Sequence, residues 1–333
     1  MKHLFVCHTQ YNLILSVGLS TPHDDLVLFK DFNLTDELKK RLEGKFERCM
    51  FLAGNFPKKE LTAKEKLEKI TIDNQKLKTF IGMYDRIFIV DDMCIQEMYA
   101  LKCAYSKNPA IEMSWLEDGA IAYFNNGVIS RGMGSTPLKR IVRKLFFSVR
   151  FNLFGFYDLA SCIGGHKRLS SAYVVFPDNI RPELRSKKLI AVTDEQFLNG
   201  MKFMYAGEEK QFAPGSVLIA MDKLDVYGDK LNDVNGLIET VVYETTANVY
   251  YKYHPRETEI LPALKKCKEL ERTVALESYL TNANTKELTV IGIKSTALQT
   301  AKKMGFQAVS YISQIEQNNA IVNFYKSIGV ECR

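Results

Sequence analysis

Short runs of apolar residues alternate with charged, helix-favouring segments along this chain of 333 residues. Many runs are apolar at every position, which is typical of strands buried on both faces of a sheet. In the first half the pattern predicts strands at residues 3–8, 25–29, 48–53, 86–90, 112–116 and 173–176. In the second half it predicts strands at residues 217–221, 249–253, 273–276, 288–293 and 308–312.

Charged segments of helical character lie between these runs, among them 36–48, 62–77 and 261–270. Strands that alternate with helices predict an α/β fold in which helices cover both faces of parallel sheets. The pattern occurs twice, and the loop-like stretch 195–216 separates the two halves.

We therefore expect two Rossmann-like, doubly wound domains that face each other across a cleft, an acceptor-side domain at 1–195 and a nucleotide-sugar-binding domain at 210–312. Residues 313–333 contain a predicted final helix, which we expect to pack back on the first domain. Ligands of such sheets bind at the carboxyl ends of the strands, so candidate chemistry is sought there.

The composition is that of a globular protein, with 46% hydrophobic and 25% charged residues. The net charge of +6 favours phosphates, acidic sugars or an anionic membrane surface, and no nucleic-acid-binding signature accompanies it. The seven cysteines are scattered without a Cys-x-x-Cys pair, which argues against a disulfide framework or a structural zinc site and fits a reducing cytoplasm. The sequence predicts neither a signal peptide nor a membrane-spanning helix.

Two acids and a glycine, Glu117, Asp118 and Gly119, directly follow a predicted strand. A carboxylate at a strand end can accept a proton from a bound hydroxyl, and glycine lets the backbone turn sharply beside a ligand. The alternative is a simple acidic turn.

His254 and Pro255 end another predicted strand, between the cations Lys252 and Arg256. Histidine at neutral pH can donate a hydrogen bond to phosphate or protonate a leaving group, and a packed or capping histidine is the alternative. His8 is the other histidine at a predicted strand end.

Ser295 and Thr296 open a predicted helix after a third strand. Backbone amides at a helix N-terminus combined with two hydroxyls make an anion site. An ordinary helix cap without a ligand is the alternative.

These three motifs, in this order, resemble those of the bacterial sialyltransferases, which share a D/E-D/E-G motif, an HP motif and a Ser/Thr-rich phosphate motif. The chain looks closest to the lipooligosaccharide sialyltransferases of family 52 and the capsule polysialyltransferases of family 38. Its opening CHTQYNLI, with His8, Thr9, Gln10 and Asn12, is similar to the CHTPYHLL-like opening of the former.

The resemblance implies a GT-B fold and transfer of sialic acid from CMP-sialic acid to a terminal sugar of a bacterial surface glycan. Asp118 would be the base that deprotonates the acceptor, supported by Glu117. His254 would contact the CMP phosphate, as general acid, and Ser295 and Thr296 would hold that phosphate. The remaining substrate contacts would include Gly119, Pro255, His8, Thr9, Gln10 and Glu277, the last on the cytidine ribose.

A carboxylate on one side of the sugar and a phosphate-binding group on the other describe an inverting displacement. No metal cofactor is expected, since the sequence lacks an Asp-x-Asp triplet, and the nearest acidic pair, Asp91-Asp92, is read as a solvated strand end.

The stretch 137–157 interleaves basic and apolar residues at helical spacing, and Arg131 lies just upstream. It predicts a helix that lies on the inner face of the cytoplasmic membrane, where a lipid-linked acceptor would be found. A core helix, a homodimer interface or a surface that steers an acidic acceptor are the alternatives.

Two alternatives remain for the function of the whole chain. It could be a GT-B enzyme for another nucleotide sugar, or a non-catalytic nucleotide- or sugar-binding protein.

Overall fold

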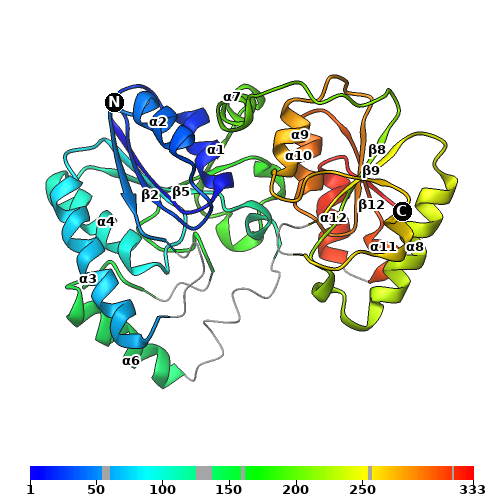
Figure 1. The fold of residues 1–333 in the computed structure, drawn as a ribbon. Coiled ribbons are helices and arrows are strands. Elements are labelled where there is room, and N and C mark those ends of the chain that lie inside the picture. The colour runs from blue at the N-terminus through cyan, green and yellow to red at the C-terminus, as the bar shows by residue number, and fades with distance from the viewer. Residues whose placement is uncertain (55–60, 125–136, 159–161, 254–256, 317–318) are drawn as a thin grey trace. The chain divides into compact units, whose positions relative to one another are not determined.

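The computed structural model describes residues 1–54, 61–124, 137–158, 162–253, 257–316 and 319–333. The chain divides into two compact units, Met1–Gly200 and Met201–Arg333, each built around its own parallel sheet (Figure 1). The boundary falls inside the stretch 195–216 that the sequence marks as the break between the halves.

The sheet of the first unit has the strand order β3-β2-β1-β4-β5-β6-β7, and neighbouring strands pair in parallel. The order reverses between β1 and β4, which is the topological switch point where such sheets bind ligands. The strands are β1 (His3–Cys7), β2 (Asp25–Phe29), β3 (Arg48–Leu52), β4 (Arg86–Ile89), β5 (Glu112–Leu116), β6 (Ser171–Val174) and β7 (Lys188–Ala191). The helices are α1 (Gln10–Leu19), α2 (Asp36–Lys45), α3 (Ala63–Phe80), α4 (Ile95–Lys107), α6 (Pro137–Arg150) and α7 (Asp194–Tyr205), which continues into the second unit.

The sheet of the second unit repeats this arrangement in the order β10-β9-β8-β11-β12-β13, with its switch point between β8 and β11. Its strands are β8 (Val217–Ala220), β9 (Val249–Lys252), β10 (Lys268–Glu269), β11 (Thr289–Gly292), β12 (Gln307–Ser310) and β13 (Glu331–Cys332). Its helices are α8 (Leu231–Glu244), α9 (Leu276–Thr281), α10 (Ala297–Lys303), α11 (Ile312–Ile315) and α12 (Asn319–Ser327).

Local sequence signals explain where the first-unit elements begin. Every residue of β2 is buried, as expected for a strand with helices on both faces. Thr62 and Glu65 form a reciprocal capping box at the start of α3, and Thr9 and Asn12 form the same kind of box at the start of α1. These caps fix the points at which the chain leaves a strand-end loop and enters a helix.

Glycine lets α1 approach α7 closely. A Cβ atom added to Gly18 would lie 2.1 Å from the carbonyl oxygen of Gln196, and one added to Gly200 would lie 2.1 Å from that of Ile14. Both contacts are between backbones, so a side chain at either position would force the helices apart.

Two predictions for the second unit were wrong. Residues 273–276 form no strand, because the chain turns there and α9 begins at Leu276. The predicted helix 261–270 is a short 3-10 turn at Pro262–Leu264 followed by β10, an exposed two-residue edge strand. Pro262 starts the turn, and a strand this short and charged has no apolar pattern to reveal it.

Other differences lie at the edges of the sheets. The edge strands β7 and β13 were not predicted, and β6 begins two residues before the predicted run. Residues 313–333 contribute both α12 and β13 to the second unit. Their predicted packing against the first domain stays a prediction. In the described part of the chain, no helix combines the length and hydropathy that crossing a bilayer requires.

Candidate functional site

The acidic motif lies at the carboxyl end of β5 in the first unit. β5 ends at Leu116, and Gly119 has a φ of 61°, a left-handed conformation that suits glycine. A 3-10 turn, Gly119–Ala122, follows directly. The turn brings the side chains of Glu117 and Asp118 into two different environments.

Glu117 is fully buried and tied to three separate segments. The hydroxyls of Tyr11 and Tyr123 each donate to one of its carboxylate oxygens, and the backbone N–H of Val175 donates at 2.6 Å. Burial raises the pKa of Glu117 to about 7, although these three donors oppose the shift. This arrangement suits a residue that holds the site together.

Asp118 is partly exposed and makes one side-chain hydrogen bond to the described residues, from the Asn12 side chain to Oδ1 at 3.0 Å. The same Asn12 nitrogen donates to the Glu117 carbonyl at 3.3 Å. Burial raises the pKa of Asp118, and the charge of Asp91 adds to the rise while Asn12 and His8 oppose it. A carboxylate with a raised pKa and limited hydrogen bonding is suited to accept a proton.

The opening motif contributes structure as well as candidate contacts. The Thr9 hydroxyl accepts from the Asn12 N–H at 3.2 Å, and the Asn12 side chain accepts from the Thr9 N–H at 3.1 Å. The capping box therefore orients the amide that reaches Asp118. Gln10 is the first residue of α1 and is partly buried.

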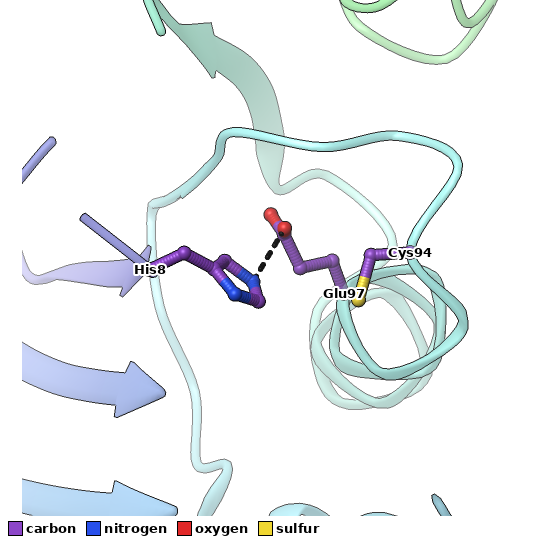
Figure 2. Close-up of side chains that lie close together, drawn as sticks. All are labelled: His8, Cys94 and Glu97. Atoms are coloured by element: carbon purple, nitrogen blue, oxygen red, sulfur yellow. Dashed lines mark ion pairs between the residues drawn. The ribbon is translucent and has the colours of Figure 1, made fainter. Parts of the chain in front are cut away.

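His8 lies just after β1, between two carboxylates. Its Nε2 is 2.9 Å from Glu97 Oε1 (Figure 2). Its Nδ1 is 3.0 Å from Asp31 Oδ2, and its ring stacks on Phe29 with 4.4 Å between centroids. Burial by itself lowers the pKa of His8, but the negative charge of Glu97 and the hydrogen bond with Asp31 outweigh it and raise the pKa well above 6.5.

A cavity of about 240 Å³ adjoins His8 at this end of the first sheet. Asp31, Cys94 and Gln96 line it, together with Lys66 and Lys69 from α3. A cavity with both acidic and basic groups at a switch point is suited to a polar ligand.

The switch point of the second unit has different residues. Asp222 follows β8, and its Oδ2 accepts from the Tyr227 hydroxyl at 2.6 Å and from the Lys294 N–H at 3.2 Å. Ser295 and Thr296 come next, before α10. Ser295 is half-buried, with its carbonyl accepting from the Tyr325 hydroxyl at 3.0 Å, and Thr296 is exposed.

Glu277 lies in the first turn of α9. The sequence had indicated that it directly follows a strand, and this prediction was wrong. Burial raises its pKa, and the charge of Lys252 opposes the rise. Lys252 ends β9 and donates to the carbonyls of Tyr253 at 2.8 Å and Arg272 at 2.9 Å. His254, Pro255 and Arg256 lie outside the described residues.

The acidic pair Asp91-Asp92 is not a solvated strand end, because Asp92 is fully buried. Its oxygens accept from the Gly164 N–H at 3.0 Å and the His166 N–H at 2.7 Å. Asp92 therefore anchors a loop between strands β5 and β6. Burial raises its pKa to about 6.

Several partners of the candidate residues were not predicted: Tyr11, Asn12, Glu97, Tyr123 and Asp222. Asn12 does carry a sequence signal, since it is a polar residue at the start of the apolar stretch that forms α1. A polar residue on a buried helix position needs a hydrogen-bond partner, and here that partner is in the site.

Solved structures with this architecture show which class of fold the two units define. The α/β-galactoside α-2,3-sialyltransferase of the luminous marine bacterium Photobacterium phosphoreum aligns with a TM-score of 0.53 and 12% identity, over 99% of this chain and 98% of that chain. The GT-B domain of a Photobacterium damselae sialyltransferase aligns with a TM-score of 0.50 and 13% identity, over 99% of this chain and 97% of that chain. The UDP-GlcNAc 2-epimerase of Methanocaldococcus jannaschii aligns with a TM-score of 0.57 and 13% identity, over 100% of this chain and 89% of that chain.

These structures show the fold alone, and they confirm the predicted GT-B class with two Rossmann-like domains. The sequence adds the family. Residues 52–313 match the profile of the alpha-2,8-polysialyltransferase (POLYST) family, and the chain belongs to that family. A search of curated proteins found no match. The family match confirms the predicted sialyltransferase-type glycosyltransferase.

Proposed function

We propose that this chain transfers sialic acid from CMP-sialic acid to a hydroxyl of a bacterial surface glycan, with inversion at the anomeric carbon. The observation that carries the proposal is the pair of acids after β5 in a chain of this family. Glu117 is fixed by three donors, while Asp118 keeps a raised pKa and one amide contact. The capsule, a lipooligosaccharide or an O-antigen would supply the acceptor.

In the proposed reaction Asp118 takes the proton of the acceptor hydroxyl while the hydroxyl oxygen attacks the anomeric carbon. The bond from that carbon to the phosphate oxygen breaks, and CMP leaves with its electron pair. Ser295, Thr296 and His254 would stabilise the phosphate, with His254 as the acid, and Glu277 would bind the ribose. Charge on the phosphate is balanced by protein groups, so transfer proceeds without a metal.

The donor class is tested by thermal denaturation in chelator with CMP, UDP or GDP. A ligand that binds only the folded state stabilises it by about 2.7 kcal/mol at a hundredfold excess over its dissociation constant. We expect a higher midpoint with CMP, and CMP release when CMP-sialic acid and a sialylated oligosaccharide are added. Stabilisation by UDP alone would point to another nucleotide-sugar enzyme, and CMP binding without turnover to a binding protein.

The exposed face of α6 supports a peripheral position on the membrane. Apolar residues occupy the solvent-facing positions at helical spacing, each between 48% and 70% exposed: Leu138, Ile141, Val142, Leu145, Phe146 and Val149. Lys139, Arg143, Lys144 and Arg150 are also exposed on this helix. An apolar stripe bordered by cations matches the interface of an anionic bilayer, where a lipid-linked acceptor would lie.

Vesicle sedimentation tests this position. We expect binding to vesicles that contain phosphatidylglycerol and weaker binding to phosphatidylcholine alone. Leu145→Glu should abolish the binding, and Ile72→Glu, at an exposed apolar position of α3, should not. A wild type that ignores anionic vesicles and forms dimers, which dissociate with Leu145→Glu, would make this face a homodimer interface instead.

A further inference from the structure

Three side chains with different ligand atoms meet at the switch point of the first sheet. His8 follows β1, Cys94 is the N-cap residue of α4, and Glu97 lies three positions later in the first turn of that helix (Figure 2). One nitrogen, one sulfur and one carboxylate oxygen lie within 4.8 Å of one another. The scattered cysteines argue against a cysteine-rich zinc site, but this cluster needs only one thiolate.

The imidazole of His8 is held in the orientation of a metal ligand. Its Nδ1 is hydrogen-bonded to Asp31 Oδ2 at 3.0 Å, which leaves Nε2 directed toward Glu97 and Cys94. In zinc proteins the ligating histidine usually donates its second N–H to a carboxylate, and this contact fixes the ring. Nε2 lies 2.9 Å from Glu97 Oε1 in an ion pair, so this nitrogen faces the carboxylate that would bind the same ion.

The carboxylate of Glu97 is fixed as well. It is fully buried, and the backbone N–H groups of Val90 and Asp91 donate to its two oxygens at 2.7 and 3.0 Å. Each carboxylate oxygen has two lone-pair positions, so Oε1 can accept one hydrogen bond and still bind a cation.

We propose that His8 Nε2, the Cys94 thiolate and Glu97 Oε1 bind one Zn²⁺, with a fourth coordination position open to the adjoining cavity. Tetrahedral zinc with bonds of about 2.0 Å to N and O and 2.3 Å to S places its ligand atoms roughly 3.3–3.6 Å apart. The three ligand atoms lie within 4.8 Å of one another, so the side chains would adjust on binding to reach this geometry. Imidazole and thiolate ligands favour zinc over magnesium or calcium.

The charges around the cluster suit a divalent cation. Asp31, Asp91 and Asp118 add carboxylates to that of Glu97 in the same neighbourhood, since the charge of Asp91 acts on Glu97, Cys94 and Asp118. On binding, Cys94 and His8 release their protons, and the ion balances the remaining negative charge. Lys66 and Lys69 also line the cavity into which the fourth position would open.

The test is metal binding itself, so it does not depend on sialyl transfer. Protein stripped with chelator is titrated with Zn²⁺ by calorimetry and then with Co²⁺, whose absorption reports geometry and thiolate ligation. We expect one equivalent of Zn²⁺, four-coordinate visible bands for Co²⁺, and a thiolate-to-cobalt charge-transfer band.

Matched variants assign the ligands. Cys94→Ala should lose the charge-transfer band and weaken zinc binding at least 100-fold, whereas Cys103→Ala, on the same helix, should bind as the wild type does. Asp31→Asn should weaken binding about 10- to 100-fold, as expected for a group that orients a ligand. His8→Gln, if folded by circular dichroism, should also lose the site.

Absence of zinc binding at micromolar concentration, or binding that Cys94→Ala leaves unchanged, would overturn the proposal. The cluster would then be an imidazolium held between Asp31 and Glu97. Either result leaves the assignment of CMP and of Asp118 to be judged by their own measurements.

Discussion

The sheets of the two units share the order of six strands, and different chemistry follows the carboxyl ends of those strands. In the first unit the residues after the strands are mainly acidic, with Glu117 and Asp118 after β5 and Glu97 opposite His8. In the second unit Lys294, Ser295 and Thr296 follow β11, and the nearby Asp222 is occupied by a tyrosine hydroxyl and a backbone N–H. In the proposed reaction the strand ends of the first unit would remove a proton, and those of the second unit would hold an anion.

The difference teaches where the fold stops specifying the chemistry. Strands β1 and β8 are apolar because both faces of each sheet are covered, and this demand is the same in both units. The requirement for apolar side chains ends with the last residue of the strand. The side chains that follow are determined by function. The contrast therefore predicts that changes in the first unit alter rate, and that changes in the second alter donor affinity.

The largest expected effect is on the rate. Asp118→Asn removes the proposed base and should lower kcat by about 10²- to 10⁴-fold, the usual contribution of a general base. CMP affinity should stay within twofold, because the proposed phosphate contacts lie in the second unit. Initial rates and CMP calorimetry on the same preparation separate the two quantities.

Asp91→Asn is the matched control, since it removes a neighbouring carboxylate and keeps Asp118. Loss of the Asp91 charge should lower the pKa of Asp118 and move the acidic limb of the rate profile to lower pH. If Asp118→Asn keeps full activity, the base has been assigned to the wrong residue.

A smaller effect is expected on stability. Glu117→Gln leaves the donors of Tyr11, Tyr123 and Val175 without a full acceptor and should cost about 1–3 kcal/mol. The cost should depend on pH. Because burial raises the folded-state pKa from 4.5 to about 7, the wild type loses stability as pH rises from about 4.5 to 7, whereas the variant has no such titration.

The difference in thermal midpoint between wild type and Glu117→Gln should therefore be larger near pH 5 than near pH 8. Gly44→Ala in α2, where an added Cβ meets nothing within 4 Å, serves as a control with no pH dependence. A difference that grows with pH would mean that Glu117 is held as a carboxylate with a lowered pKa, and a difference that does not change with pH would mean that its pKa is not shifted.

Much of this architecture was predictable from apolar runs, since β2 and β5 have the predicted bounds and the units divide inside the predicted stretch. The failures share a physical cause. β7 and β10 are edge strands that are largely exposed, so packing imposes no apolar pattern on them. Pro262 and the charged residues after it gave a helical pattern, although residues 265–270, which follow the 3-10 turn, form no helix.

The candidate site was predictable only in part, for a similar reason. Motifs placed Asp118 and Ser295 after strands, because a strand end can be inferred from the sequence. Glu117 was expected beside Asp118, but its three donors come from α1, the turn after β5 and the end of β6. Such convergence depends on how the elements pack, and no sequence spacing encodes it.

The smallest effect is expected at the second switch point, on CMP affinity. The Ser295 hydroxyl accepts from the Ala297 N–H over 3.4 Å, and the Thr296 side chain makes no capping bond to the described residues. Removing either hydroxyl thus costs the fold little. A hydrogen bond to a charged group contributes about 1.5 kcal/mol or more, so Ser295→Ala and Thr296→Val should each weaken CMP binding roughly 10-fold.

Calorimetry with CMP measures this effect, and Thr240→Val, at an exposed site on α8, is the control. The contrast between the units requires that the two hydroxyl variants keep the maximal rate at saturating donor, because the proposed role of Ser295 and Thr296 is to bind the phosphate equally in the ground state and the transition state. A fall in kcat with unchanged affinity would instead make these hydroxyls selective for the departing phosphate. The second switch point would then share the catalytic step with Asp118, and the division of rate and affinity between the two units would fail.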